Sequence, residues 1–162
     1  MKTVYLGIGS NIGDREANLR EAIDRMEAAG VRVTRRSSLY ETEPREVLDQ
    51  PCFLNAAVEA ATELFPLQLL ACIRNIERAM GRRRVTPKGP RNIDIDILYY
   101  GRSVIHTPEL DTPHPGIAER CFVLEPLAEI APDFRHPMNG KTAREMLAAL
   151  APQGVRRLNA TL

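Results

Sequence analysis

The sequence predicts an α+β fold in one domain, and three observations lead to that prediction. The chain has 162 residues, 44% of them hydrophobic, which is enough for one sizeable core. Segments with strand-like alternation and segments with helical spacing follow one another in the order β-α-β-β-α-β. No repeat, low-complexity stretch or linker divides the sequence, so residues 1–162 are expected to form a single domain. This order is the split βαβ arrangement of a ferredoxin-like sheet, with two helices on one face.

The first part of the chain supplies a strand, a helix and a second strand. Residues 2–9 (KTVYLGIG) are apolar, end in glycines and predict a buried strand. Asp14 can accept hydrogen bonds from the free amides of a first helical turn, which predicts a helix to about Ala29 that Gly30 ends. Apolar and polar residues alternate at the start of residues 31–40 and predict a half-exposed strand.

The middle of the chain repeats this strand and helix content after a loop. Residues 41–51 hold turn residues without periodicity and predict a long loop, a kind of segment that is often functional. Residues 52–62 (CFLNAAVEAAT) predict a third strand. Pro66 suits a first helical turn, and apolar residues at helical spacing follow it until Gly81 ends the helix.

The last part of the core is a strand that follows a basic loop. It lies within residues 89–101 (GPRNIDIDILYYG). Beyond it we expect short strands, a proline-rich loop and helical turns near residues 123–130 and 142–150.

Composition excludes several classes of function. The net charge is +1, from 22 basic and 21 acidic residues, so there is no global electrostatic attraction to nucleic acid or to an acidic membrane. The three cysteines, Cys52, Cys72 and Cys121, lack metal-site spacing and are expected to be buried, reduced thiols. The sequence begins with no signal peptide and has no apolar run of membrane-spanning length. We therefore expect a soluble, cytoplasmic protein.

The strand within residues 89–101 presents a physical problem. Alternation places its isoleucines on one face and both Asp94 and Asp96 on the other, about 6.6 Å apart along the strand. Two unit charges at that distance repel by roughly 2.5 kcal/mol at an effective dielectric constant near 20. An exposed edge strand or pairing with arginines would remove the problem. So would Mg²⁺, which is typically held by one or two carboxylates together with substrate phosphates.

A basic cluster precedes these aspartates. Its members are Arg82, Arg83, Arg84, Lys88 and Arg91. Any one of them could be a solvated loop residue, but arginine also binds phosphate oxygens in a bidentate manner. Cations beside paired carboxylates are what a complex of polyphosphate and Mg²⁺ requires.

Other candidate residues are weaker on their own. His114, in a Pro-His-Pro segment, could contact phosphate, although a lone loop histidine is more often a surface or hydrogen-bonded residue. Asn55 shares a strand face with Phe53 and could bind a heterocycle through its amide, but hydrogen bonding at the strand end explains it equally well. The GIGSNIG segment matches neither common phosphate-loop pattern, so its glycines are expected to permit close packing.

Four segments together resemble a known family. They are YLGIGSNIGD, DQPCFLNAAVE, GPRNIDIDILYYG and TPHPGIAERCFVLEPLAEIAPDFRHP, and they span nearly the whole chain. With them the chain resembles the 6-hydroxymethyl-7,8-dihydropterin pyrophosphokinases of folate biosynthesis. The resemblance implies a ferredoxin-like core elaborated into a three-layer α/β sandwich. It also implies transfer of diphosphate from ATP to the pterin hydroxymethyl group, release of AMP, and two Mg²⁺ ions.

The resemblance assigns roles to individual residues. Asp94 and Asp96 would ligate both metal ions, and Arg82 and Arg91 would stabilise the transferred charge. The positions that match ATP contacts or the catalytic loop are Glu77, Arg82, Arg84, Arg91, Ile97, His114 and Arg120. The positions that match the pterin site are Thr42, Pro44, Phe53, Asn55 and Phe122.

The sequence departs from the family pattern at a few positions. Lys88 stands where many members have an aromatic residue that helps cover the pterin. Glu109 and Asp111 stand where some members have a basic and a hydroxyl residue near ATP. These differences concern details of substrate contact, whereas the carboxylate pair is intact.

Two other functions remain as alternatives. One is a ferredoxin-like binding module without catalysis, for instance for RNA, although the chain lacks the aromatic run and basic face of such sheets. The other is an ordinary kinase that transfers only the γ-phosphate and leaves ADP. For the pyrophosphokinase we expect a monomer whose partners are ATP and the pterin, with no nucleic acid and no membrane.

Overall fold

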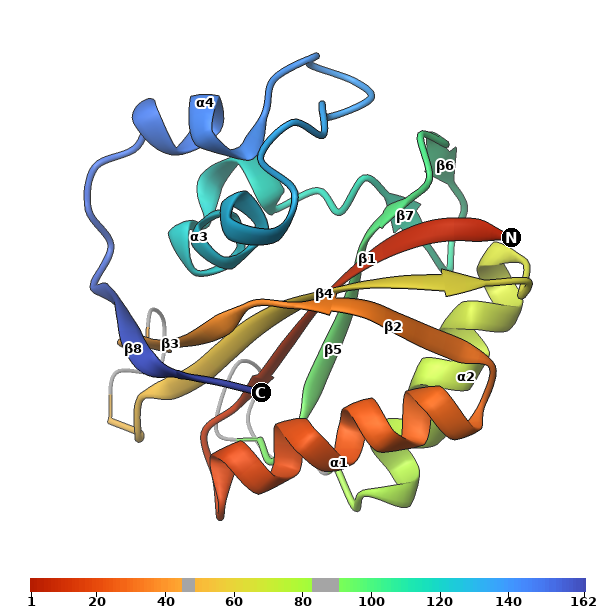
Figure 1. Cartoon of the computed structure of the whole chain (residues 1–162), viewed down its shortest axis with the longest axis horizontal. Coiled ribbons are helices and arrows are strands. Elements are labelled where there is room, and N and C mark those ends of the chain that lie inside the picture. The colour runs from red at the N-terminus through yellow and green to blue at the C-terminus, as the bar shows by residue number, and fades with distance from the viewer. Residues whose placement is uncertain (45–48, 83–90) are drawn as a thin grey trace.

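A computed structural model describes residues 1–44, 49–82 and 91–162 (Figure 1). The strands in this part of the chain are β1 (Lys2–Ser10), β2 (Val31–Arg36), β3 (Ser38–Thr42), β4 (Phe53–Thr62), β5 (Asp94–Tyr100), β6 (Ile105–His106), β7 (Asp111–Thr112) and β8 (Val155–Thr161). The helices are α1 (Arg15–Ala28), α2 (Pro66–Ala79), α3 (Cys121–Ile130) and α4 (Ala143–Ala148), with a 3-10 turn η1 (Ile117–Glu119) before α3.

The main sheet is antiparallel and has the strand order β5-β1-β4-β3-β8, with β2 pairing with β4 beside β3. Helices α1 and α2 cover one face, and α3 and α4 cover the other (Figure 1). The ferredoxin-like core and its three-layer elaboration are therefore confirmed. Strand β5 lies at an edge of the sheet, but most of its residues are buried, so the interpretation of its aspartates as exposed to solvent is not met. None of the helices in the described ranges is both long and apolar enough to cross a membrane.

The predicted helix boundaries have the expected local causes. The Asp14 side chain accepts a hydrogen bond from the Ala17 amide at 3.1 Å and caps α1. Helix α2 begins at Pro66, whose missing amide proton costs nothing in a first turn. After α2, Gly81 has a φ of +75°, a left-handed conformation that glycine adopts without strain.

The predicted strand over residues 31–40 is two strands, β2 and β3. The break falls at Ser37, which is fully buried. Its amide donates to the Ala57 carbonyl at 2.9 Å, and its hydroxyl accepts from the Ala57 amide at 2.9 Å. The serine side chain thus replaces one backbone partner, and the chain changes register without losing a hydrogen bond.

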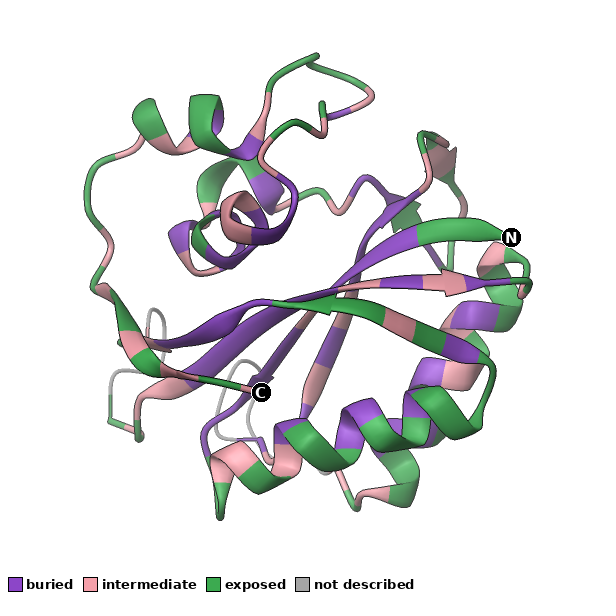
Figure 2. Ribbon diagram, viewed as in Figure 1, coloured by how far each residue is buried: buried purple, intermediate pink, exposed green. Residues whose placement is uncertain are grey.

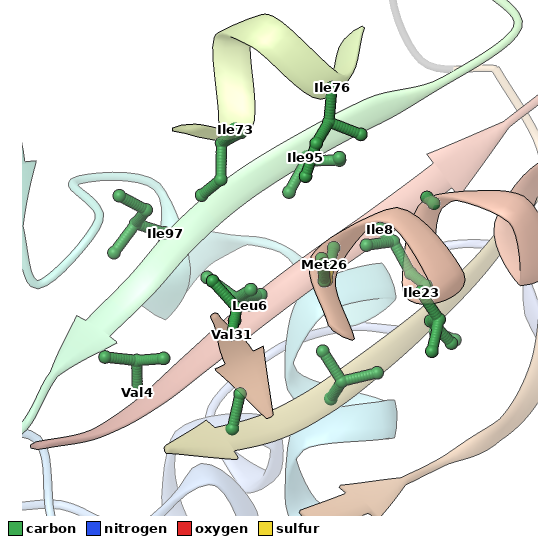
Figure 3. Packing of buried hydrophobic residues seen from close by; sticks show 14 of the residues in the cluster. Val4, Leu6, Ile8, Ile23, Met26, Val31, Ile73, Ile76, Ile95 and Ile97 are labelled. Atoms are coloured by element: carbon green, nitrogen blue, oxygen red, sulfur yellow. The ribbon is translucent and has the colours of Figure 1, made fainter. Parts of the chain in front are cut away.

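Two hydrophobic clusters lie on opposite faces of the sheet. Figure 3 shows the first, in which Ile95 and Ile97 of β5 pack beside Ile73 and Ile76 of α2. The second lies beneath α3 and α4 and includes Leu98. The buried residues of α1 and α2 follow the stripe that faces the sheet, and their outer faces are exposed (Figure 2). Alternation along β5 therefore leaves the face that carries Asp94 and Asp96 free for a site.

Candidate functional site

A cavity of about 460 Å³ lies between the sheet and the start of α3, on the face opposite α1 and α2. It is lined by residues of β1, β3, β4, β5 and α3 and by the segments that join them. The sequence-predicted site residues that line it are Thr42, Phe53, Asn55, Arg91, Asp94, Asp96, His114, Arg120 and Phe122. The fold thus brings together residues that are as much as 80 positions apart in the sequence.

Two glycines of β1 lie at the floor of the cavity. Gly7 of β1 pairs with Ala57 and Asp96, and Gly9 pairs with Asn55 and Asp94. A Cβ atom at Gly9 would lie 2.7 Å from Oδ1 of Asn55, which is closer than such atoms approach. The glycines therefore permit close packing, as expected, here of the Asn55 side chain over Gly9 and of the Leu98 side chain over Gly7.

Asp94 is paired with two arginines. Its Oδ1 lies 3.1 Å from Nη2 of Arg82, and its Oδ2 lies 3.3 Å from Nη1 of Arg91. The guanidinium groups compensate the carboxylate charge, so the structural interpretation by arginine pairing applies to this aspartate. It does not conflict with metal binding, because phosphate oxygens are alternative partners for the same guanidinium groups.

Asp96 has no comparable ion pair among the described residues. Burial and the neighbouring Asp94 carboxylate raise the pKa of Asp96 to about 7. The carboxylate still reaches the cavity, and its side chain is 39% exposed there. Nε2 of His114 lies 3.9 Å from Oδ1 of Asp96, while burial lowers the pKa of His114 and favours the neutral ring. The charges of Arg120 and Arg82 lower the pKa of Asp96 only in part, so among the described residues this carboxylate is less well compensated than Asp94.

A buried ion pair holds the two sides of this cluster together. Glu77, near the end of α2, accepts the Ile95 amide of β5 at 3.0 Å, and its carboxylate lies 3.2 Å from Nη1 of Arg82. Arg82 consequently bridges Glu77 and Asp94. Neither Glu77 nor Arg82 is part of the cavity lining, but Arg82 contacts the lining residue Asp94.

Two phenylalanines, Phe53 and Phe122, line the same cavity, and the part that they line is called the aromatic slot below. The guanidinium of Arg91 lies 5.1 Å from the centre of the Phe53 ring, and that of Arg120 lies 5.8 Å from the centre of the Phe122 ring. Thr42 and Asn55 line the same cavity, and Nδ2 of Asn55 donates to Oγ1 of Thr42 at 2.8 Å. The slot thus combines aromatic faces with a polar edge.

Some predicted positions do not join this group. The Ile97 side chain packs in the cluster against α2, on the opposite face of β5, so any ATP contact would have to come from its backbone. Pro44 lies next to the cavity-lining Glu43 but is not in the lining, and neither are Glu109 and Asp111. Arg83, Arg84 and Lys88 lie outside the described residues.

Sequence reasoning missed some residues of the cavity wall. Glu43 and Glu119 both line it, and neither was predicted. Single acidic residues in a loop and a short turn carry no periodic or motif signal. Proximity of Glu119 to Arg120 in the sequence was the one available indication.

Comparison with known proteins places the chain in a family. The model of the 7,8-dihydro-6-hydroxymethylpterin-pyrophosphokinase (HPPK) family matches residues 5–132. The chain belongs to this family. It is 48% identical to the 2-amino-4-hydroxy-6-hydroxymethyldihydropteridine pyrophosphokinase of Methylorubrum extorquens, over 98% of this chain and 99% of that one. The enzyme of the same name from Bacillus subtilis is 50% identical over 78% of this chain and 76% of its own length.

The pyrophosphokinase family also includes longer relatives. The mitochondrial folate synthesis bifunctional protein of Pisum sativum is 48% identical over 78% of this chain, which spans 25% of that protein. Among solved structures, Plasmodium falciparum HPPK-DHPS with pteroate superposes with a TM-score of 0.73 at 17% identity, covering 91% of this chain and 42% of that one. That structural likeness supports the fold.

Proposed function

We propose that this chain transfers diphosphate from ATP to the hydroxymethyl group of 6-hydroxymethyl-7,8-dihydropterin, giving AMP and the pterin diphosphate in folate biosynthesis. One observation carries the proposal beyond family membership. A single cavity joins an aromatic slot, between Phe53 and Phe122, to a cluster of carboxylates and arginines. The slot suits a flat heterocycle, and the cluster suits a polyphosphate with its cations.

The residues of the slot would bind and orient the pterin. Phe53 and Phe122 would enclose the two faces of the ring. Thr42 and Asn55 would hydrogen-bond to the polar edge of the pterin. These bonds would replace part of the hydrogen bonding between the two side chains. The hydroxymethyl group would then point along the floor toward Asp94 and Asp96. Such alignment supplies much of the rate acceleration in phosphoryl-type transfer.

The residues of the charged cluster would bind the nucleotide. Arg91, Arg120 and His114 line the cavity beside the carboxylates and would contact phosphate oxygens. Arg82 and Arg91 would stabilise charge that develops as the β-phosphorus is attacked and AMP departs. Their present pairing with Asp94 holds both guanidinium groups near that position.

The donor set fits two Mg²⁺ ions held by Asp94 and Asp96. Carboxylates are hard oxygen ligands, and the raised pKa of Asp96 indicates that a nearby cation would relieve an unfavourable charge. No group of three or more metal-binding side chains occurs in the described part of the chain, so water and phosphate oxygens would complete the coordination. When bound, the ions would neutralise phosphate charge and lower the pKa of the attacking hydroxyl.

Product analysis tests the proposed reaction. The chain is incubated with ATP, Mg²⁺ and the reduced pterin, and nucleotides are separated by chromatography. AMP formed in proportion to the pterin diphosphate is the expected result. ADP would instead identify a kinase that transfers the γ-phosphate, and unchanged ATP would favour a binding module without catalysis.

The proposal includes a monomeric cytoplasmic enzyme whose partners are these two small molecules. The nearly balanced charge supports the expectation that neither nucleic acid nor a membrane surface is a partner. Size-exclusion chromatography with light scattering tests the oligomeric state, and a gel shift with RNA tests the nucleic-acid alternative.

A further inference from the structure

Asn11 is a buried polar residue that lies outside the cavity. It follows β1, just before the turn that leads into α1, and is 1% exposed. It does not line the cavity, so it has no direct route to a substrate. Burial of a primary amide is unfavourable unless its hydrogen bonds are made. The partners of Asn11 therefore indicate what the residue does.

The hydrogen bonds of Asn11 join two segments that are far apart in the sequence. Its backbone amide donates to the Arg91 carbonyl at 3.0 Å, and its Oδ1 accepts from the Arg91 amide at 2.8 Å. Its Nδ2 donates to Oε1 of Gln50 at 2.8 Å and to the Pro51 carbonyl at 3.1 Å. One side chain thus holds the residue that precedes β5 and the residues that precede β4.

Both held segments continue directly into the site. Arg91 has a side chain that is only 11% exposed, with Nη1 3.3 Å from Oδ2 of Asp94 and its guanidinium 5.1 Å from the Phe53 ring centre. Pro51 lies two residues before Phe53, at the start of β4. Asn11 therefore fixes the backbone on both sides of the contact between Arg91 and Phe53, where the charged cluster meets the aromatic slot.

We propose that Asn11 is a positioning residue for diphosphate transfer, which sets Arg91 and Phe53 relative to each other without touching a substrate. The proposal rests on the proposed function. Asparagine suits the task because one side chain accepts from an amide on one segment and donates two protons to the other. Aspartate would retain the bond from the Arg91 amide but would place an acceptor against the Pro51 carbonyl.

The first test compares Asn11→Ala with Asn18→Ala. Asn18 of α1 is a matched control that bonds to the same turn, because its Nδ2 donates to Oγ of Ser10 at 3.3 Å and to the Ile12 carbonyl at 3.0 Å. Asn11→Ala is expected to lower kcat by about 10- to 100-fold, the scale of a small misplacement of catalytic groups. Asn18→Ala should stay within about twofold of the unmodified chain. An equal loss of kcat in the two variants would show that Asn11 has only a general structural role, and would overturn the proposal.

A double-mutant cycle shows whether Asn11 acts through Arg91. In an Arg91→Ala background the proposal expects Asn11→Ala to change kcat by less than about twofold, because the group that it positions is absent. The same fold-loss in both backgrounds would overturn the proposal. If Asn11→Ala does not fold, Asn11→Asp replaces it. That variant keeps the Arg91 bond and loses both Nδ2 bonds, and is expected to raise the KM for the pterin more than it lowers kcat.

A crystal structure of the variant provides a readout that does not depend on activity. The Arg91 Cα is expected to move by about 1 Å relative to Phe53, a displacement large enough to affect catalysis. An unchanged Arg91 would refute the positioning role even if the enzyme were fully active. Absence of AMP formation by the unmodified chain would instead count against the proposed function, and the structure would still decide the role of Asn11.

Discussion

At the scale of single residues, Asp94 and Asp96 illustrate how one strand can give two identical side chains different properties. Both lie on the cavity face of β5, two residues apart. Asp94 is compensated by Arg82 and Arg91, whereas Asp96 is desolvated beside another carboxylate, which raises its pKa to about 7. The unfavourable electrostatic free energy of this site thus arises mainly from Asp96.

Replacement of Asp96 by asparagine is therefore expected to separate activity from stability. Asp96→Asn should lower kcat by at least about 100-fold, because it removes an anionic oxygen from the site that would hold the cations. Its circular dichroism spectrum should match that of the unmodified chain. Near-normal AMP formation by the variant would remove Asp96 from the mechanism.

The stability of the same variant should depend on pH. The pKa of Asp96 is raised from 3.8 to about 7 by folding, so the folded state holds a proton that the unfolded state releases. In metal-free buffer this residue destabilises the fold progressively as pH rises between those values, and fully above about pH 7. Asp96→Asn should consequently raise Tm more at about pH 8 than at about pH 4. A Tm difference that is the same at both pH values would contradict this origin of the shift.

How far the site could be predicted from sequence also differs between residues. Strict alternation along a strand places Asp94 and Asp96 together, so pattern alone identified the pair. The same alternation puts Ile97 on the other face, and its predicted role in ATP binding came from resemblance alone. Asn11 and Glu43 could not be found by pattern, because their partners are reached only through long-range folding.

At the scale of secondary structure, one carboxylate of helix α3 joins it by hydrogen bonds to the edge of the sheet, in addition to its hydrophobic packing. Glu129 accepts hydrogen bonds from the Ser38 amide at 3.0 Å, from the Ser38 hydroxyl at 3.0 Å and from the Tyr40 hydroxyl at 2.8 Å. Arg157 of β8 also lies 3.3 Å from it. Glu129 therefore connects α3, whose second residue is Phe122, to strands β3 and β8.

Removal of the Glu129 carboxylate should lower the free energy of unfolding. Glu129→Ala leaves the Tyr40 hydroxyl and the Ser38 amide without their charged acceptor, and both residues are at most 3% exposed. We expect a loss of about 3 kcal/mol in the free energy of unfolding, measured by urea denaturation. Glu125→Ala, at an exposed position of the same helix, is the matched control and should change it by less than about 0.5 kcal/mol. Equal changes in the free energy of unfolding for the two variants would show that the hydrogen bonds of Glu129 do not stabilise the fold specifically.

Elements with a strong local signal were predicted well, and those defined by tertiary pairing were not. Helices α1 and α2 have caps and apolar stripes, and their boundaries agree with the prediction to within a residue or two. The break at Ser37 depends on hydrogen bonds to Ala57 that no local pattern reveals. Strand β8 was missed because most of it is exposed and its pairing partner β3 is over a hundred residues away.

At the scale of the whole molecule, β8 completes the sheet by covering the free edge of β3. It also packs Leu158, Ala160 and Leu162 against the cluster beneath α1 and α2. The family match ends at residue 132, so this strand lies outside the matched region. It lies at the opposite end of the strand order from β5, and it pairs through Val155 with Thr42 of the cavity lining.

Truncation after Gln153 tests the contribution of β8. Removal of β8 should lower the free energy of unfolding by at least about 2 kcal/mol, through loss of partly buried leucines, and should promote aggregation through the exposed β3 edge. Denaturation and light scattering measure the two effects. Arg156→Ala, an exposed change within β8, should have little effect on either. A truncated chain as stable and monodisperse as the full one would show that β8 is dispensable.

The two clusters on opposite faces of the sheet also bear on how this scaffold could be adapted to a different working temperature. The cavity lies on the side of the sheet that α3 covers, while α1 and α2 bury their side chains on the other side of β1, β4 and β5. Apart from Glu77 of α2, whose carboxylate reaches Asp94 through the Arg82 side chain, thermostabilising substitutions introduced behind the sheet would act on the reacting groups only through strand backbones. Heat tolerance and substrate preference could therefore be engineered almost independently, by repacking one layer and redesigning the other.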